Sequence, residues 1–218
     1  METLKVVHED ERLLAVDKPS GLLVIAGRGP ARDGATLLAL ATAHVGAQTF
    51  VVHRIDRETS GLVLFAKDAA AHRALCAAFE SRAVRKTYLA AVAGTPPDSG
   101  EVTLALRAFG SGRVAPASDG KPCATAYRVR ERFPSGALLE VEPRTGRRHQ
   151  IRAHLNALGH PVLGDTLYGK DRPVGGAPRL MLHAWELCVP LPGGVPLELR
   201  AEPPEDFLAV LRPLRGDR

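Results

Sequence analysis

A short charged segment, HRIDRETSG at residues 53–61, lies between two apolar runs of the chain. Its ionisable side chains are those of His53, Arg54, Asp56, Arg57 and Glu58. The run TFVV before it and the run LVLFA after it favour buried strands, so the segment is predicted to connect two strands. Loops held by rigid strands frequently carry catalytic side chains, and the Asp56 carboxylate could act there as a nucleophile or a base. A solvated, salt-bridged turn has the same composition, so the residues alone leave both interpretations open.

A second charged segment, RTGRRHQIR at residues 144–152, has four arginines in nine residues. It opens a predicted helix in which Ile151, Leu155 and Leu158 form the buried stripe. Gly159 is predicted to end this helix, because glycine readily adopts the left-handed conformation that follows a last helical turn.

The arginines of this predicted helix suggest an anionic partner. Arg148 and Arg152 are four residues apart, so we expect them to share one face, with Arg152 able to reach inward. Arg147 and Arg148 are predicted to lie in the first turn, where the helix dipole disfavours cations by roughly 0.3–1 kcal/mol each. A protein carboxylate or a nucleic-acid phosphate close to these arginines would offset their unfavourable interaction with the dipole. His149 is a further polar group in the same segment. Simple solvation of the arginines is the alternative.

The residues argue against two other kinds of site. The segment GPARDGAT at residues 29–36 resembles a phosphate-binding P-loop, but Ala35 stands where the phosphate-binding lysine should be. His149 and His154 are five residues apart, so on a helix they differ by about 140 degrees and cannot chelate one metal ion together. We therefore expect no nucleotide hydrolysis and no metal site.

The elements that must position these segments are short strands interrupted by a few helices. Helical spacing predicts helices from about Thr36, over residues 69–86 and over residues 204–214. Alternating or β-rich runs predict strands at residues 4–10, 12–19, 86–94, 101–109, 123–133, 136–143, 179–190 and 196–203. Residues 110–122 are typical of a mobile loop. Because strands and helices do not alternate regularly, we expect an α+β fold with a mixed, mainly antiparallel sheet, as a single domain over residues 1–218.

Composition favours a globular protein with a polyanionic partner. The 218 residues include 29 Lys and Arg against 24 Asp and Glu, which gives a net charge of +5 and a pI near 9.4. The three cysteines, Cys76, Cys123 and Cys188, are far apart and odd in number, which fits a reducing cytoplasm better than a disulfide framework. The sequence shows neither an apolar run of about 18 residues nor a secretory signal.

Four segments together resemble the successive motifs of the RluA-type RNA pseudouridine synthases, in their order and approximate spacing. They are VHRIDRETSGLVLFAK, KTYLAAVAG, TGRRHQIRAHLNALGHPVLGDTLYG and RLMLHAWEL. The resemblance implies an enzyme that breaks the bond between base and ribose of a uridine in RNA, turns the base and rejoins it through carbon. This isomerisation demands no cofactor and no metal. The resemblance also implies the short form of the family, without the extra N-terminal RNA-binding domain of many relatives.

The resemblance further implies roles for individual residues. Asp56 matches the catalytic aspartate, Tyr88 the tyrosine that stacks against the target uracil, and Arg152 the arginine that pairs with the aspartate. Arg54 matches the arginine that helps to occupy the space left by the flipped nucleotide, and Ile55 replaces the commoner leucine. We expect substrate contacts in a central RNA-binding cleft from His53, Arg54, Arg147, Arg148 and His149.

Elementary physical chemistry agrees with these roles. A catalytic carboxylate buried against a flipped base must stay ionised, and an adjacent arginine typically lowers a carboxylate pKa by ~1–3 units. Flipping the base costs roughly a few kcal/mol, of which stacking on an aromatic ring such as that of Tyr88 can return ~1–3 kcal/mol. The residues do not decide whether Asp56 attacks the sugar, attacks the base or abstracts a ribose proton.

We expect a monomer that acts in the cytoplasm on structured ribosomal or transfer RNA, with a stem-loop as the target. One alternative is a catalytically inactive RNA-binding module of the same fold. A damaged position at Asp56, Tyr88 or Arg152 would favour it, and all three residues are present. The other alternative is a phosphodiester hydrolase that uses His53 or His149, for which the sequence supplies no second acid–base partner.

Overall fold

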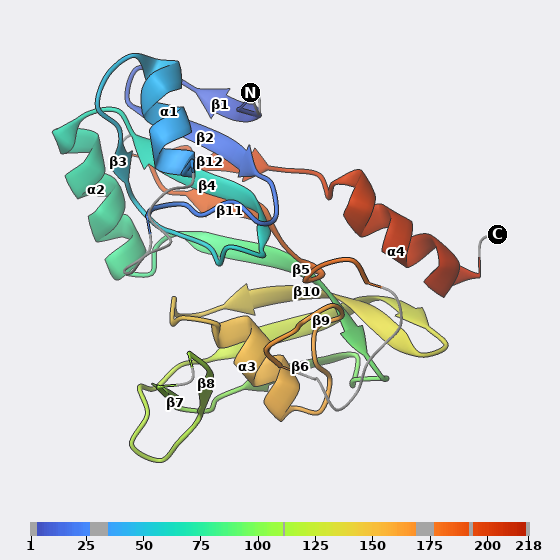
Figure 1. Ribbon diagram of the computed structural model, residues 1–218. Helices are drawn as coiled ribbons and strands as arrows, with labels where there is room; N and C mark the ends of the chain where they lie inside the picture. Colours follow the sequence, from blue (N-terminus) through green and yellow to red (C-terminus); the bar gives the residue numbers. More distant parts are fainter. Residues whose placement is uncertain (1–3, 27–34, 111, 169–176, 192–193, 217–218) are drawn as a thin grey trace. The chain divides into compact units, whose positions relative to one another are not determined.

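The computed structural model describes residues 4–26, 35–110, 112–168, 177–191 and 194–216, and these form two compact units. The first unit contains Met1–Lys86 and Ala184–Glu202, and the second contains Thr87–His183 and Pro203–Arg218 (Figure 1). Each combines antiparallel strands with helices, so the predicted α+β class is confirmed. The single domain over residues 1–218 stays a prediction. Most of the P-loop-like segment lies outside the described residues.

The sheet of the first unit has the order β1-β2-β4-β11, with β3 beside β4 and β12 beside β11. Its strands are β1 (Val6–Glu9), β2 (Leu13–Lys18), β3 (Phe50–Val51), β4 (Ser60–Ala66), β11 (Leu182–Val189) and β12 (Leu197–Arg200). Every residue of β2 and β4 is buried, which explains why both read as nearly continuous apolar runs. Gly61 permits the close approach of β11, since an added Cβ would lie 2.2 Å from the Ala184 carbonyl oxygen.

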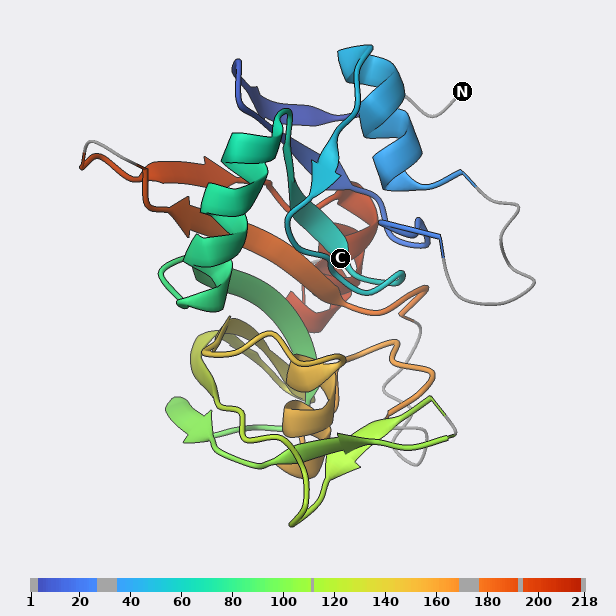
Figure 2. The same ribbon diagram turned by 90° about the vertical axis from the view of Figure 1, so that its left-hand side faces the viewer.

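Two capped helices complete the first unit. The Thr36 side chain accepts a hydrogen bond at the start of α1 (Leu37–Val45), and the Asp68 side chain accepts two at the start of α2 (Ala69–Glu80). Apolar side chains of α2 pack against β2 and β4, and Figure 2 shows α2 lying across the strands. The helix predicted over residues 69–86 ends earlier, because Arg82 has a φ of 61° and cannot continue a right-handed helix.

The second unit contains a sheet of order β5-β10-β9-β6 and a separate two-stranded ribbon, all antiparallel. The strands are β5 (Arg85–Ala93), β6 (Ser99–Val102), β7 (Leu106–Ala108), β8 (Val114–Pro116), β9 (Thr125–Phe133) and β10 (Gly136–Pro143). The single strand predicted over residues 101–109 is therefore divided between β6 and β7. The predicted mobile loop over residues 110–122 contains β8, which pairs with β7.

Two helices belong to the second unit. Helix α3 (Gln150–Ala157) packs against β8, β9 and β10, as Figure 1 shows. Helix α4 (Glu205–Arg215) is joined to the rest of the unit by ion pairs of Asp206 with Arg179 and of Arg215 with Glu131. In the described part of the chain, no helix is long and apolar enough to cross a membrane.

Candidate active site

Asp56 lies in the loop that connects β3 to β4 in the first unit. Ile55 anchors the loop inward because its side chain is buried, whereas Asp56 is partly exposed and Arg54 is exposed. The Thr59 N–H donates a hydrogen bond of 3.2 Å to the Asp56 carbonyl oxygen, so a tight turn separates Asp56 from β4. The prediction that the charged segment connects two strands is confirmed.

The backbone that follows Asp56 is held by the end of β2. Lys18 is fully buried, and its ammonium donates hydrogen bonds of 2.8–2.9 Å to the backbone carbonyls of Pro19, Leu22 and Arg57. The Ser20 hydroxyl donates to the Glu58 carbonyl over 2.6 Å. A buried ammonium needs such partners, because desolvation without them is costly. This role of Lys18 was not predicted, although a lysine that ends a mostly apolar strand is a signal for it.

His53 fastens the other end of the loop. Its ring stacks on Phe79 with centroids 4.7 Å apart, and its Nε2 accepts a 3.1 Å hydrogen bond from the Leu64 N–H. Burial lowers the pKa of His53 to about 3, with a further contribution from the positive charge of Lys86. The ring is therefore neutral at neutral pH, with its proton on Nδ1. This state disfavours His53 as a general acid for RNA hydrolysis.

Arg152 and Asp165 form a buried ion pair in the second unit. The Arg152 Nε and Nη2 donate to the two carboxylate oxygens over 2.7 and 2.8 Å, and the side chains are 4% and 0% exposed. The same carboxylate accepts the backbone N–H groups of Leu167 and Tyr168. Asp165 was missed in the sequence, where an isolated aspartate in the run PVLGDTLYG is its signal. The expected pairing of Arg152 with Asp56, a residue of the first unit, stays a prediction.

Tyr168 lies beside this pair and links it to neighbouring segments. Its hydroxyl accepts a 2.7 Å hydrogen bond from the Val114 N–H of β8 and lies 3.2 Å from the His149 Nδ1. The Arg152 guanidinium carbon lies 5.2 Å from the centre of the Tyr168 ring, within cation–π range. Burial raises the pKa of Tyr168, so the hydroxyl keeps its proton at neutral pH.

The segment before α3 differs from its prediction. Helix α3 begins at Gln150 because His149 has a φ of 52°, so Arg147 and Arg148 precede the helix and both are exposed. The predicted first-turn penalty for these arginines was therefore wrong, as was the shared helical face of Arg148 and Arg152. Leu158 was also wrongly assigned to the buried stripe, since the residue is 37% exposed.

Tyr88 lies on β5, where it pairs with Val141 of β10 and is partly buried. The structure thus places His53, Arg54 and Asp56 on one loop of the first unit. In the second unit it brings Arg147, Arg148, His149 and Arg152 together around the start of α3.

The chain matches the family model described as RNA pseudouridylate synthase over residues 12–157, which include Asp56, Tyr88 and Arg152. It belongs to the RNA pseudouridylate synthase family. Members of this family are isomerases, and the resemblance inferred from the motifs is confirmed.

Relatives of this family cover most of the chain. Ribosomal large subunit pseudouridine synthase D of Nitrosomonas europaea is 37% identical over 98% of the chain and 66% of its own length. Dual-specificity RNA pseudouridine synthase RluA of Yersinia pestis is 36% identical over 90% of the chain and 98% of its own length. The chain thus spans about two thirds of the first relative and almost all of the second.

Solved structures of the family have the same fold. Human RNA pseudouridylate synthase domain containing 4 superimposes with a TM-score of 0.81 at 27% identity, over 97% of this chain and 93% of the human one. Human RNA pseudouridylate synthase domain containing 1 gives a TM-score of 0.78 at 29% identity, over 93% and 84% of the two chains.

Proposed function

We propose that this protein isomerises specific uridines of ribosomal or transfer RNA to pseudouridine. The observation that carries the proposal is the family match over residues 12–157, which spans the loop that presents Asp56. The curated relatives include enzymes named for ribosomal RNA, for transfer RNA and for both. The reaction rearranges one nucleotide, so the balance of atoms requires no co-substrate.

In the proposed reaction, Asp56 is the catalytic carboxylate. It acts while the bond between base and ribose breaks, and the base then turns and rejoins the ribose through carbon 5. Loss of the proton from carbon 5 and protonation of the ring nitrogen that has left the ribose complete the isomerisation. The turn at Thr59 and the clamp from Lys18 limit the movement of the Asp56 backbone, which supports a fixed orientation of the carboxylate.

Tyr88 and Arg152 are the proposed partners of Asp56. The Tyr88 ring would stack on the flipped uracil, and such stacking is worth ~1–3 kcal/mol per base. Its hydroxyl could assist removal of the proton from carbon 5. Arg152 would stabilise the ionised carboxylate of Asp56. The bidentate contact with Asp165 supports this role, because it fixes the plane of the Arg152 guanidinium.

The proposed RNA contacts come from His53, Arg54, Arg147, Arg148 and His149. Exposure of the three arginines supports contacts with phosphates, whereas the engaged Nε2 of His53 favours a supporting role for that residue. We further propose that the protein acts as a monomer in the cytoplasm, without a metal ion, on a structured target such as a stem-loop.

Release of tritium from RNA labelled at carbon 5 of its uracils tests the function. The wild-type protein should release tritium from unmodified ribosomal or transfer RNA. Asp56→Asn keeps the shape of the side chain but removes its charge, so it should lose turnover while it retains most of the RNA affinity. Undiminished turnover by Asp56→Asn would refute the role of the carboxylate. RNA binding without release by the wild type would instead favour an inactive RNA-binding module.

A further inference from the structure

Gln150, the first residue of α3, folds its side chain back onto the turn that precedes the helix. Only 3% of the residue is exposed. Its Oε1 accepts a 3.1 Å hydrogen bond from the Arg147 N–H and a 2.6 Å hydrogen bond from the Thr145 hydroxyl. The His149 side chain provides no cap for the helix. Gln150 therefore does not cap the helix but holds the turn that precedes it.

The other half of the Gln150 amide points to the start of β9. Its Nε2 donates hydrogen bonds of 2.8 Å to the Ala124 carbonyl and 3.0 Å to the Thr125 hydroxyl. The Arg147 N–H can only donate and the Ala124 carbonyl can only accept, so these two contacts fix which end of the amide is the oxygen. Both N–H groups and both acceptor positions of Gln150 are used.

The Thr125 hydroxyl also contacts His154, which is fully buried in α3. It accepts from Gln150, so its own hydrogen is donated to the His154 Nδ1 over 2.9 Å. The His154 Nε2 then donates to the Leu104 carbonyl over 2.9 Å. The Cys123 thiol, 3.5 Å from the same Nε2, donates to that carbonyl as well. Burial lowers the pKa of His154, which agrees with the neutral ring that this pattern requires.

These contacts form one relay of hydrogen bonds, in which each group donates to the next from the Arg147 amide to the Leu104 carbonyl. The relay consists of His154, Thr125 and Gln150, and every hydrogen in it has one donor and one acceptor. Buried networks that are fully satisfied in this way rigidify the segments they join. The segment held at the end of the relay carries the exposed side chains of Arg147 and Arg148, which leave the protein in directions set by the backbone of the turn.

We propose that Gln150, Thr125 and His154 are positioning residues that hold Arg147 and Arg148 in the orientation in which they contact RNA phosphates. This inference rests on the proposed function, because it assigns the relay to the binding of the RNA substrate. None of the three side chains needs to touch RNA, since the relay acts through the backbone of residues 145–149.

Thr125→Val tests the relay, because it removes the hydroxyl and leaves the shape of the side chain. We expect the Kd for RNA to rise on the order of tenfold, and the slope of log Kd against log salt concentration to become shallower by about 1–2. The loss should fall on KM more than on kcat. Thr125→Ser, which restores the hydroxyl, should restore both the affinity and the slope.

Thr49→Val is the matched control, because it removes a buried hydroxyl that bonds to Thr42 in the first unit. We expect Thr49→Val to lose about as much thermal stability as Thr125→Val but to keep the wild-type Kd for RNA. Thr145→Val removes the second hydrogen bond to the Gln150 Oε1, at the partly exposed end of the relay, and serves if Thr125→Val does not fold. A Thr125→Val protein with the Kd and salt slope of the wild type would overturn the proposal.

A double-mutant cycle separates this proposal from the proposed function. Arg147→Gln with Arg148→Gln should weaken RNA binding, and adding Thr125→Val should weaken it little further, because the residues act as one unit. Fully additive losses would overturn the relay. If the arginine variants bound RNA like the wild type, the proposed RNA contacts themselves would be wrong, whatever Thr125→Val does.

Discussion

At Arg152 and Asp165, two opposite charges are removed from water and balanced against each other. Both side chains are almost fully buried, so neither charge is solvated when its partner is lost. The pair therefore bears on the proposed effect of Arg152 on Asp56. A guanidinium whose charge is largely compensated by Asp165 stabilises another carboxylate mainly through directed hydrogen bonds, and less through its net charge.

The buried pair leads to a prediction about stability. Asp165→Asn keeps an oxygen for the N–H groups of Leu167 and Tyr168 but removes the carboxylate charge that the buried Arg152 guanidinium contacts through two hydrogen bonds, so the free energy of unfolding should fall by ~3–5 kcal/mol. Urea denaturation measures the change. Adding Arg152→Met should restore part of the stability, because the buried positive charge is then removed as well. Asp206→Asn, at a half-exposed carboxylate, is the control and should cost ~1 kcal/mol or less. Equal losses for the two asparagine variants would contradict the prediction.

At the scale of elements, His53 makes the attachment of the Asp56 loop to α2 and β4 sensitive to acid. The folded ring has a pKa of about 3 against its ordinary value of 6.5, so the unfolded chain binds the proton first as the pH falls. Stability should therefore be full above pH 6.5 and decline between pH 6.5 and about 3. In His53→Gln, whose side chain can still accept from the Leu64 N–H, this decline should be less steep. Urea titrations at several pH values compare the slopes, and identical slopes would exclude the assigned role.

The elements that could be predicted are those whose signals are local. Strands β2 and β4 follow from their apolar runs, and helices α1 and α2 from Thr36 and Asp68, which cap the helices that begin at the next residue. The start of α3 could not be predicted, because Gln150 is buried by hydrogen bonds to β9, about 25 positions earlier in the chain. The strand β8 was missed for a similar reason, since the hydroxyl of a distant residue, Tyr168, binds its Val114.

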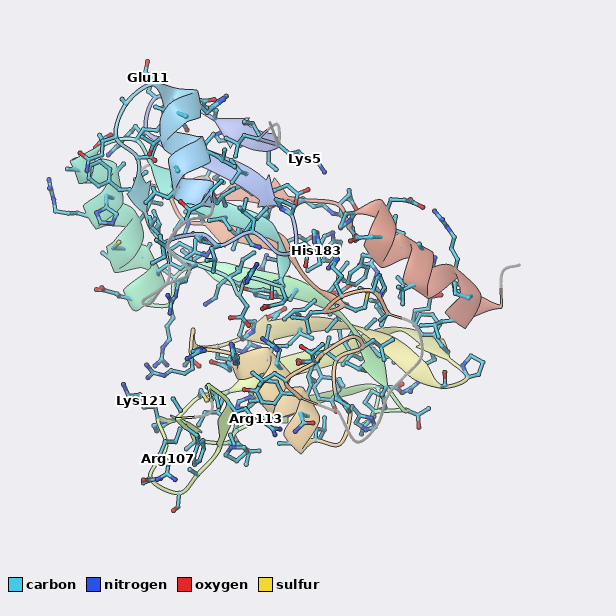
Figure 3. The ribbon with its side chains drawn as sticks, viewed as in Figure 1. Lys5, Glu11, Arg107, Arg113, Lys121 and His183 are labelled. Atoms are coloured by element: carbon cyan, nitrogen blue, oxygen red, sulfur yellow. The ribbon has the colours of Figure 1, made fainter. Side chains whose placement is uncertain are left out.

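At the scale of the whole molecule, the number of basic residues overstates the positive charge available to RNA. Several arginines of the second unit already bind carboxylates: Arg128 and Arg130 bind Glu140, Arg132 binds Asp98, and Arg179 binds Asp206. The basic composition agrees with the proposed RNA partner, but it could not indicate which arginines are balanced, because the paired residues lie apart in the chain and meet only in the folded protein. Arg107 and Lys121 lie near the strands β7 and β8 (Figure 3), and Arg107 there binds Asp119.

The salt dependence of RNA binding should distinguish balanced arginines from available ones. Arg147→Gln with Arg148→Gln should reduce the slope of log Kd against log salt concentration by about 2, the value for two lost phosphate contacts. Arg132→Gln removes the same kind of charge, but its guanidinium is held by Asp98 and the Pro96 carbonyl, so the slope should change by well under 1. Filter binding to one unmodified RNA at salt concentrations from about 0.05 to 0.2 M gives both slopes. If Arg132→Gln reduced the slope as much as the loss of Arg147 and Arg148 together, net charge rather than individual contacts would govern the affinity.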